Sequence, residues 1–175
     1  MKNKQPKEEK AGQRGGRSQA TRLEKKHDPY RHGTNRADTK LSEPTVCTGC
    51  KAVYQEGRWL WSDAANPTGR PALCPACERI RDKKPAGEIR ISGAFARAHR
   101  DEVLARARHI EEREKAEHPL QRIIEIRDEA DEIVVTTTDV HVAHAIGVAL
   151  HAAFKGELQA PWGEKGELLR VRWSR

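Results

Sequence analysis

The sequence has no run of 18 apolar residues, whereas a helix needs about 20 to cross a membrane, so no membrane-spanning segment is expected. Residues 1–10 carry positive charges, but no apolar stretch follows them, and no secretory signal is predicted. Hydrophobic residues make up only 36% of the chain and charged residues 34%, which is little material for one large core. These absences favour a soluble cytoplasmic protein with one ordinary domain, or two small domains and a tail.

The common signatures of catalytic sites are also missing. The sequence shows no Ser/His/Asp or Cys/His pairing, no phosphate-binding loop, no dinucleotide-binding fingerprint and no carboxylate pair with an evident role. We therefore expect a protein that is not an enzyme, with no small-molecule substrate.

The four cysteines are the most informative residues present. They form two C-x-x-C pairs, Cys47/Cys50 and Cys74/Cys77, with 23 residues between the pairs. Each pair can fold into a knuckle that presents both sulfurs to one ion, and two knuckles make a closed tetrahedral site. A closed site leaves no open coordination position, so the pattern predicts one structural Zn²⁺ ion. Two disulfides, a rubredoxin-like iron centre and a pair of redox-active dithiols are alternative interpretations that the sequence supports less well.

Residues 1–42 are predicted to be a disordered basic arm. Residues 1–40 hold twelve Lys/Arg and five Asp/Glu, so they carry the whole +7 net charge of the chain and leave residues 41–175 balanced. The segment has no hydrophobic periodicity and is too polar to bury a core. Arg14 and Arg17 flank two glycines, an arrangement common in RNA-binding arms. The alternative is a solvated tail that keeps the protein soluble.

Residues 43–84 are predicted to form a zinc ribbon. Residues 52–54 and 58–61 are expected to be two short strands joined around Glu56-Gly57, and 66–69 a turn toward the second knuckle. Arg58, Trp59 and Trp61, with Tyr54, can form a stacking platform for unpaired bases. For any single ring we favour the alternative that it supplies hydrophobic contacts, because small metal domains have little core.

Residues 85–175 are predicted to form an α+β domain. The hydrophobic pattern gives the order β-α-β-β-α-β, which is the ferredoxin-like arrangement of two helices over one face of a four-stranded antiparallel sheet. The strands are expected at 88–92, 120–127, 133–138 and 168–173, and the helices from Phe95 to about His118 and from Thr138 or Asp139 to near Gly156.

Two surfaces of this domain carry candidate binding residues. His141, His144 and His151 fall on one arc of the second helix, which predicts a polar contact surface and not a catalytic metal site. Arg90, Arg170 and Arg172 are expected side by side on the uncovered sheet face as an RNA or phosphate patch. The alternative is that these arginines only keep the outer face polar.

Residues 45–175 resemble one poorly characterised bacterial family. The resemblance rests on the two knuckles and on these further segments: Ala52-Val53-Tyr54, Gly57-Arg58-Trp59, Arg79-Ile80, Asp82, Pro85-Ala86-Gly87, Ser92-Gly93, His118-Pro119-Leu120, Thr136-Thr137-Thr138-Asp139 and Gly156-Glu157. Members of that family are often described as relatives of the ribosomal-export adaptor, or nonsense-mediated-decay-associated, family of archaea and eukaryotes, which binds the large ribosomal subunit. This chain is shorter and has one pair of knuckles where the adaptor family has more. Beyond the four cysteines, the resemblance assigns no binding residue.

Together these features predict a zinc-ribbon protein that binds RNA and associates with the ribosome, as a factor in its stability or in translation. The second hypothesis is a protein–protein adaptor that uses the ribbon and the helix face. A DNA-binding regulator ranks last, because no recognition helix rich in Arg and Asn lies beside the knuckles.

Overall fold

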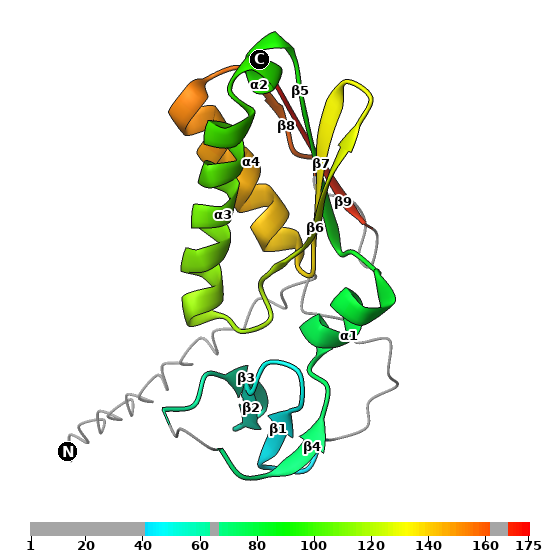
Figure 1. The fold of residues 1–175 in the computed structure, drawn as a ribbon. Coiled ribbons are helices and arrows are strands. Elements are labelled where there is room, and N and C mark those ends of the chain that lie inside the picture. Colours follow the sequence, from blue (N-terminus) through cyan, green and yellow to red (C-terminus); the bar gives the residue numbers. More distant parts are fainter. Residues whose placement is uncertain (1–40, 64–66, 162–167) are drawn as a thin grey trace, which may run out of the picture.

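The computed structural model describes residues 41–63, 67–161 and 168–175, which form two mixed β-sheets and four helices (Figure 1). The α+β class is therefore confirmed. The predicted basic arm, with Arg14 and Arg17, lies outside the described residues except for its last two. Among the helices of the described segments, none is long and apolar enough to cross a membrane.

Residues Thr45–Asp82 form a small unit that we call the cysteine module. Its sheet has the order β3-β2-β1-β4, with β1 antiparallel to β2 and parallel to β4. The predicted hairpin is confirmed, since β2 and β3 pair around Glu56-Gly57. The elements are β1 (Thr45–Cys47), β2 (Val53–Gln55), β3 (Arg58–Leu60), β4 (Arg70–Ala72) and α1 (Pro75–Asp82).

Strands β1 and β4 and helix α1 were not predicted from the sequence. Three-residue strands are too short to show alternation of polar and apolar residues. Helix α1 begins at the second knuckle, where the Sγ of Cys74 accepts a hydrogen bond from the Cys77 amide and Pro75 occupies the first turn.

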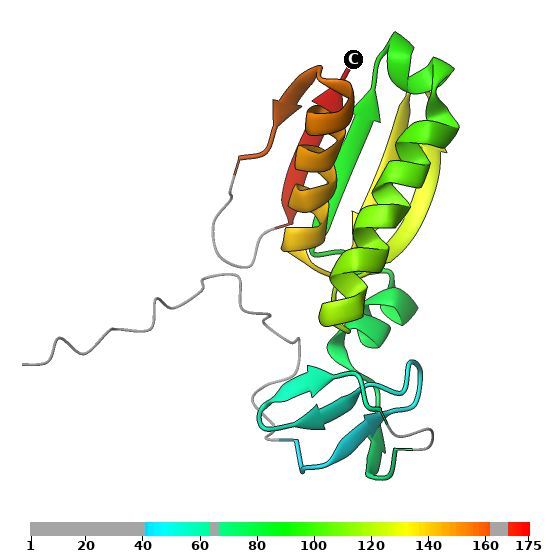
Figure 2. The same ribbon diagram turned by 90° about the vertical axis from the view of Figure 1, so that its left-hand side faces the viewer.

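Residues Gly87–Ser174 form the second unit, which we call the α+β unit. Helices α3 and α4 lie side by side over one face of its five-stranded sheet and leave the other face uncovered (Figures 1 and 2). The elements are β5 (Gly87–Ser92), α2 (Ala94–Ala98), α3 (Arg100–Glu117), β6 (Ile123–Glu129), β7 (Glu132–Thr137), α4 (Val140–Phe154), β8 (Glu157–Gln159) and β9 (Leu169–Ser174).

The predicted ferredoxin-like topology is only partly correct. The sheet order β6-β7-β5-β9-β8 places the four predicted strands in the expected sequence. However, β9 runs parallel to β5, so the sheet is mixed and not antiparallel. The cause is β8, which the sequence pattern did not reveal: it pairs antiparallel with β9 at the sheet edge and reverses the direction of the last strand.

The predicted helix from Phe95 to about His118 is two helices. The backbone leaves the helical region at His99, with φ −117° and ψ 34°, so that α2 ends there and α3 begins at Arg100. The short α2 carries Phe95, whose ring stacks on His99 with centroids 4.2 Å apart.

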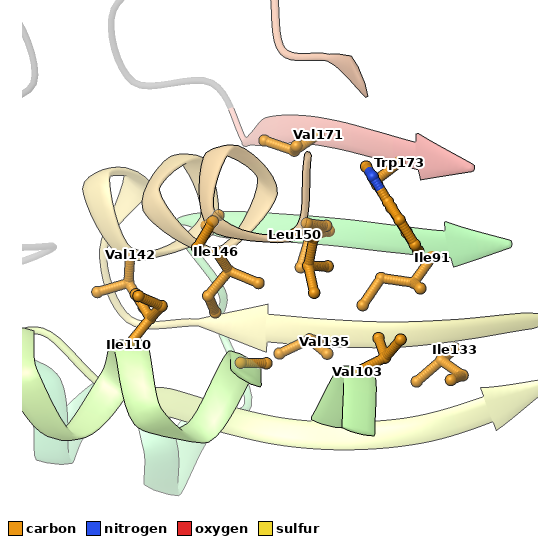
Figure 3. Packing of buried hydrophobic residues seen from close by; sticks show 14 of the residues in the cluster. Ile91, Val103, Ile110, Ile133, Val135, Val142, Ile146, Leu150, Val171 and Trp173 are labelled. Carbon is orange, nitrogen blue, oxygen red and sulfur yellow. The ribbon is translucent and has the colours of Figure 1, made fainter. Parts of the chain in front are cut away.

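The core lies between the two helices and the sheet (Figure 3). Along β9, Leu169, Val171 and Trp173 alternate with exposed arginines, as expected for a strand with one buried face. The residues that pack against them are buried in β5, β7, α3 and α4, among them Ile91, Val103, Ile110, Ile133, Val135, Val142, Ile146 and Leu150. This core fixes the ends of α3 and β7, and those ends meet the cysteine module.

Candidate metal centre

The structure brings the four predicted ligands together. The Sγ atoms of Cys47, Cys50, Cys74 and Cys77 all lie within 4.8 Å of one another. Those of Cys50 and Cys74, one from each knuckle, are 3.7 Å apart. Tetrahedral zinc with Zn–S bonds of about 2.3 Å would place its sulfurs about 3.8 Å apart. The four cysteines thus form a cluster that can hold one metal ion.

Backbone groups of both knuckles point at the sulfurs. The amides of Cys50 and Cys74 donate to Cys47 Sγ at 3.5 and 3.3 Å, and the Cys77 amide donates to Cys74 Sγ at 3.4 Å. Donors of this kind stabilise negative charge on sulfur and fix its direction before a metal arrives. The donor set and its surroundings therefore fit a thiolate-bound ion.

A cation that the sequence analysis did not identify completes the cluster. Arg122 donates from Nη2 to Cys50 Sγ at 2.9 Å and to Cys74 Sγ at 3.6 Å, and from Nη1 to Cys77 Sγ at 3.4 Å. It is only 7% exposed, although arginine is among the residues least often buried. A fourth hydrogen bond runs from Arg122 Nε to the Pro119 carbonyl at 2.7 Å.

Two segments of the α+β unit hold Arg122 in place. Its amide donates to Thr138 Oγ1 at 2.9 Å, and the Thr138 amide returns a hydrogen bond to the Arg122 carbonyl at 2.9 Å. Thr138 Oγ1 in turn donates to the Leu120 carbonyl at 2.6 Å. The His118-Pro119-Leu120 and Thr136–Asp139 segments, singled out in the sequence, therefore meet at Arg122.

Hydrogen bonds and burial shift the pKa values of the cluster residues in opposite directions. Hydrogen bonding from Cys74, helped by Arg122, lowers the pKa of Cys50 to about 4. The pKa of Cys74 is raised because it gives that hydrogen bond, and burial raises the pKa of Cys77. Burial acts to lower the pKa of Arg122, but the hydrogen bond and charge of Cys50 outweigh it and the pKa is raised, so the guanidinium stays cationic.

The aromatic residues of the module do not form a free stacking platform. Trp59 is 8% exposed and packs with Ala52, Ala76 and the cysteines, so it is a core residue of the module, which is the alternative that we favoured for a single ring. Trp61 is 36% exposed, but its Nε1 donates to the Lys115 carbonyl at 2.6 Å. Arg58 is exposed at the other end of β3 and makes only a 4.0 Å contact with Glu56.

The three arginines predicted to form a patch lie on neighbouring strands β5 and β9, but Arg90 is held by carboxylates. Arg90 pairs with Arg172 across neighbouring strands, as expected. It also contacts three glutamates, at 2.8 Å for Glu88, 3.0 Å for Glu132 and 3.4 Å for Glu129, so its predicted role as a phosphate-binding cation is not supported. Only Arg170 and Arg172 of the predicted patch are exposed without an ion pair to the described residues.

The histidine face of α4 is half-buried. His141 and His144 are partly covered, while His151 is exposed and its Nδ1 lies 3.0 Å from the Gly156 carbonyl oxygen. Burial, with the nearby His141, lowers the pKa of His144. Within the described segments the cysteine cluster is the one group of three or more His, Cys, Asp or Glu side chains placed to share an ion.

Arg122 could not be identified as part of the cluster from the sequence. It is 45 residues from Cys77 and 72 from Cys50, and a single Arg in a charged chain has no spacing signal. Comparisons of the chain with protein-family models, with curated proteins and with solved structures gave no match.

Proposed function

We propose that this chain is a non-enzymatic zinc-ribbon protein that binds RNA and associates with the ribosome. In this proposal Cys47, Cys50, Cys74 and Cys77 hold one structural Zn²⁺ ion. Three features support zinc: four thiolate ligands, the 3.7 Å sulfur separation across the knuckles, and amide and guanidinium donors aimed at the sulfurs. All four ligands come from cysteine, so the ion would organise the module and would have no position left for a substrate.

The distribution of charge carries the RNA proposal. The net +7 lies entirely in residues 1–40, whereas the rest of the chain balances and its central sheet arginine, Arg90, is held by carboxylates. A basic segment beside a neutral body fits phosphate binding through counterion release, with affinity from the arm and placement from the body. Ribosomal RNA is the target we favour, because the motifs of residues 45–175 resemble the bacterial family described above.

Co-sedimentation with ribosomes through sucrose gradients tests this proposal. We would compare the full chain, a chain without residues 1–40, an Arg14→Ala/Arg17→Ala variant and an Arg170→Ala/Arg172→Ala variant, each at low and moderate salt. We expect the full chain to stay bound at moderate salt, removal of the arm to weaken binding at both salt concentrations without abolishing it, and Arg14→Ala/Arg17→Ala to weaken it less. Each lost phosphate contact should reduce the slope of log K against log salt by about 0.7 to 0.9. The Arg170→Ala/Arg172→Ala variant also removes two positive charges, but from the body, and is the control for Arg14→Ala/Arg17→Ala.

Each outcome assigns a different function. Binding that needs residues 1–40 and is stripped by moderate salt marks a general polyanion binder. Binding that survives both the removal of residues 1–40 and moderate salt assigns the specific contact to the body. If neither the wild-type chain nor any variant sediments with ribosomes, the ribosome proposal is wrong.

A protein–protein adaptor is the second candidate, and one observation favours it. Val148, on the solvent side of α4 between His144 and His151, is 44% exposed, one of two large apolar side chains exposed in the described segments. An apolar residue on a polar helix face suits contact with a polypeptide. Binding of such a partner should be insensitive to salt and should weaken in Val148→Glu.

A further inference from the structure

The guanidinium of Arg122 is a buried cation whose only anionic neighbours among the described residues are the cysteine sulfurs. Its hydrogen bonds run to three of the four sulfurs and to the Pro119 carbonyl, and no carboxylate of the described segments forms an ion pair with it. A buried charge is tolerated when it is paired and hydrogen-bonded, and removal of the partner charge leaves it strongly unfavourable. The position of Arg122 thus depends on the charge of the cluster.

Arg122 belongs to one unit and the cluster to the other. Its backbone is fixed to Thr138 in the α+β unit, while its side chain enters the cysteine module (Figure 1 shows the two units meeting below α3). Trp61 makes a second contact between the units, from the module to the Lys115 carbonyl at the end of α3, and the Arg122 guanidinium lies over its ring at 5.9 Å. Leu120 also packs against the buried cluster of the module.

A metal ion changes the charge that Arg122 meets. Metal binding deprotonates cysteine ligands, so four thiolates with one divalent ion carry a net negative charge. The cationic guanidinium is the complement of that charge and its donors are directed at the sulfurs. The loaded cluster therefore attracts the α+β unit through Arg122 more strongly than the empty cluster, which carries less negative charge, would.

We propose that Arg122 is a positioning residue that couples metal loading of the cysteine module to docking of the module on the α+β unit. The inference rests on the metal binding proposed above. Coupling is reciprocal: if metal strengthens docking, docking strengthens metal binding by the same factor. The contact surface of the two units then depends on metal occupancy, and with it any partner surface that spans them.

The first test compares Zn²⁺ affinity, measured by competition with a chromogenic chelator, in wild type, Arg122→Gln, Arg122→Lys and Arg127→Gln. Arg122→Gln should bind Zn²⁺ about 10- to 100-fold more weakly, the range typical for loss of a group that supports metal ligands. Arg122→Lys should bind Zn²⁺ more tightly than Arg122→Gln, because the positive charge remains. It should bind more weakly than wild type, because a lysine lacks the forked guanidinium that spans three sulfurs. Arg127→Gln, a surface arginine on β6 paired with Glu125 and Glu129, should leave the affinity unchanged.

The second test loosens docking without touching a sulfur. Trp61→Phe removes the hydrogen bond to the Lys115 carbonyl and keeps all contacts of Arg122 with cysteine. Coupling requires weaker Zn²⁺ binding in Trp61→Phe, together with faster amide hydrogen exchange across residues 115–123 of the Zn²⁺-loaded protein. Arg122→Gln should accelerate the same amides while exchange within β5 and β7 stays slow, which shows that the α+β unit remains folded.

The outcomes separate this inference from the metal proposal. A wild-type chain that binds no Zn²⁺ overturns the metal centre and the coupling with it. If wild type binds Zn²⁺ and Arg122→Gln binds it equally well, the metal centre stands and the role of Arg122 is wrong. Faster exchange in Trp61→Phe with unchanged Zn²⁺ affinity also overturns the coupling, because docking and metal binding are then independent.

Discussion

Gly49 lies in the first knuckle at the point where the backbone passes closest to the second. A Cβ atom on this residue would lie 2.9 Å from Cys77 Sγ and 3.4 Å from Cys77 Cβ. Real Cβ contacts are essentially never that short, so Gly49→Ala must push the two knuckles apart. The proposed metal would fix the sulfur positions and leave little room for adjustment.

We therefore expect Gly49→Ala to weaken Zn²⁺ binding about tenfold and to destabilise the module by about 1–3 kcal/mol, the range for overpacking. Chelator competition and thermal unfolding of the Zn²⁺-loaded protein measure the two effects. Gly57→Ala is the matched control: its φ of +75° strains an alanine, but nothing lies within 4 Å of the added Cβ. It should lower stability and leave Zn²⁺ affinity unchanged. Equal Zn²⁺ affinity of Gly49→Ala and wild type would contradict this account.

For single residues, the sequence predicts those features that depend on nearby positions in the chain. The C-x-x-C spacing fixes which sulfurs can share an ion, and all four cysteines meet as expected. Trp59 and Arg90 show the limit of this kind of prediction, because an aromatic residue and an arginine are both suited to RNA contact. Strand pairing buries Trp59 and places three glutamates around Arg90, and neither effect can be read from residue type. Residue type alone cannot say whether a side chain faces solvent or a partner.

Helix α4 begins at Asp139, whose Oδ1 accepts a hydrogen bond from the His141 amide at 2.7 Å. Asp139 is fully buried, and the adjacent Thr138 holds the Arg122 segment. This short stretch therefore caps one helix and also fixes the residue that contacts the metal cluster. The sequence left Thr138 and Asp139 open as caps, and the structure assigns the cap to Asp139.

Asp139→Ala removes the acceptor and should lower the unfolding free energy of the α+β unit by about 1–2 kcal/mol. Asp139→Asn keeps an acceptor at Oδ1 and should lose clearly less. Chemical denaturation followed by far-ultraviolet circular dichroism gives both values. Equal loss in the two variants would mean that the charge of Asp139, and not its capping hydrogen bond, stabilises the helix start.

The elements that sequence analysis missed are those whose signal is short. Strands β1, β4 and β8 have three residues each, too few to show alternation. The equally short β2 and β3 were predicted because the Glu56-Gly57 turn joins them. Missing β8 had the largest consequence, because one extra edge strand makes β9 parallel to β5 and changes the sheet from antiparallel to mixed. Long periodic elements such as β5, β7 and α4 were predicted to within about two residues.

At the scale of the whole molecule, the two units differ sharply in how they are stabilised. The α+β unit has a buried cluster of 18 hydrophobic residues, including Trp173, Ile146 and Leu150. The buried cluster of the module has five residues, two of which are cysteines. A domain with so few apolar contacts cannot offset its chain entropy, so we expect the module to depend on the proposed ion and on the contact with the α+β unit to stay folded.

Removal of the metal with a strong chelator should therefore unfold the module and leave the α+β unit folded. In ¹H–¹⁵N spectra, resonances of β2 and β3 should collapse to unfolded positions, while those of β5, β7 and α4 stay dispersed. Signals of residues 115–123 should shift as well, because these residues contact the module through Lys115, Leu120 and Arg122. Re-addition of Zn²⁺ is the control and should restore all three sets. Loss of every dispersed resonance on chelation would contradict the division of stability, since the α+β core would then depend on an ion that none of its own residues binds directly.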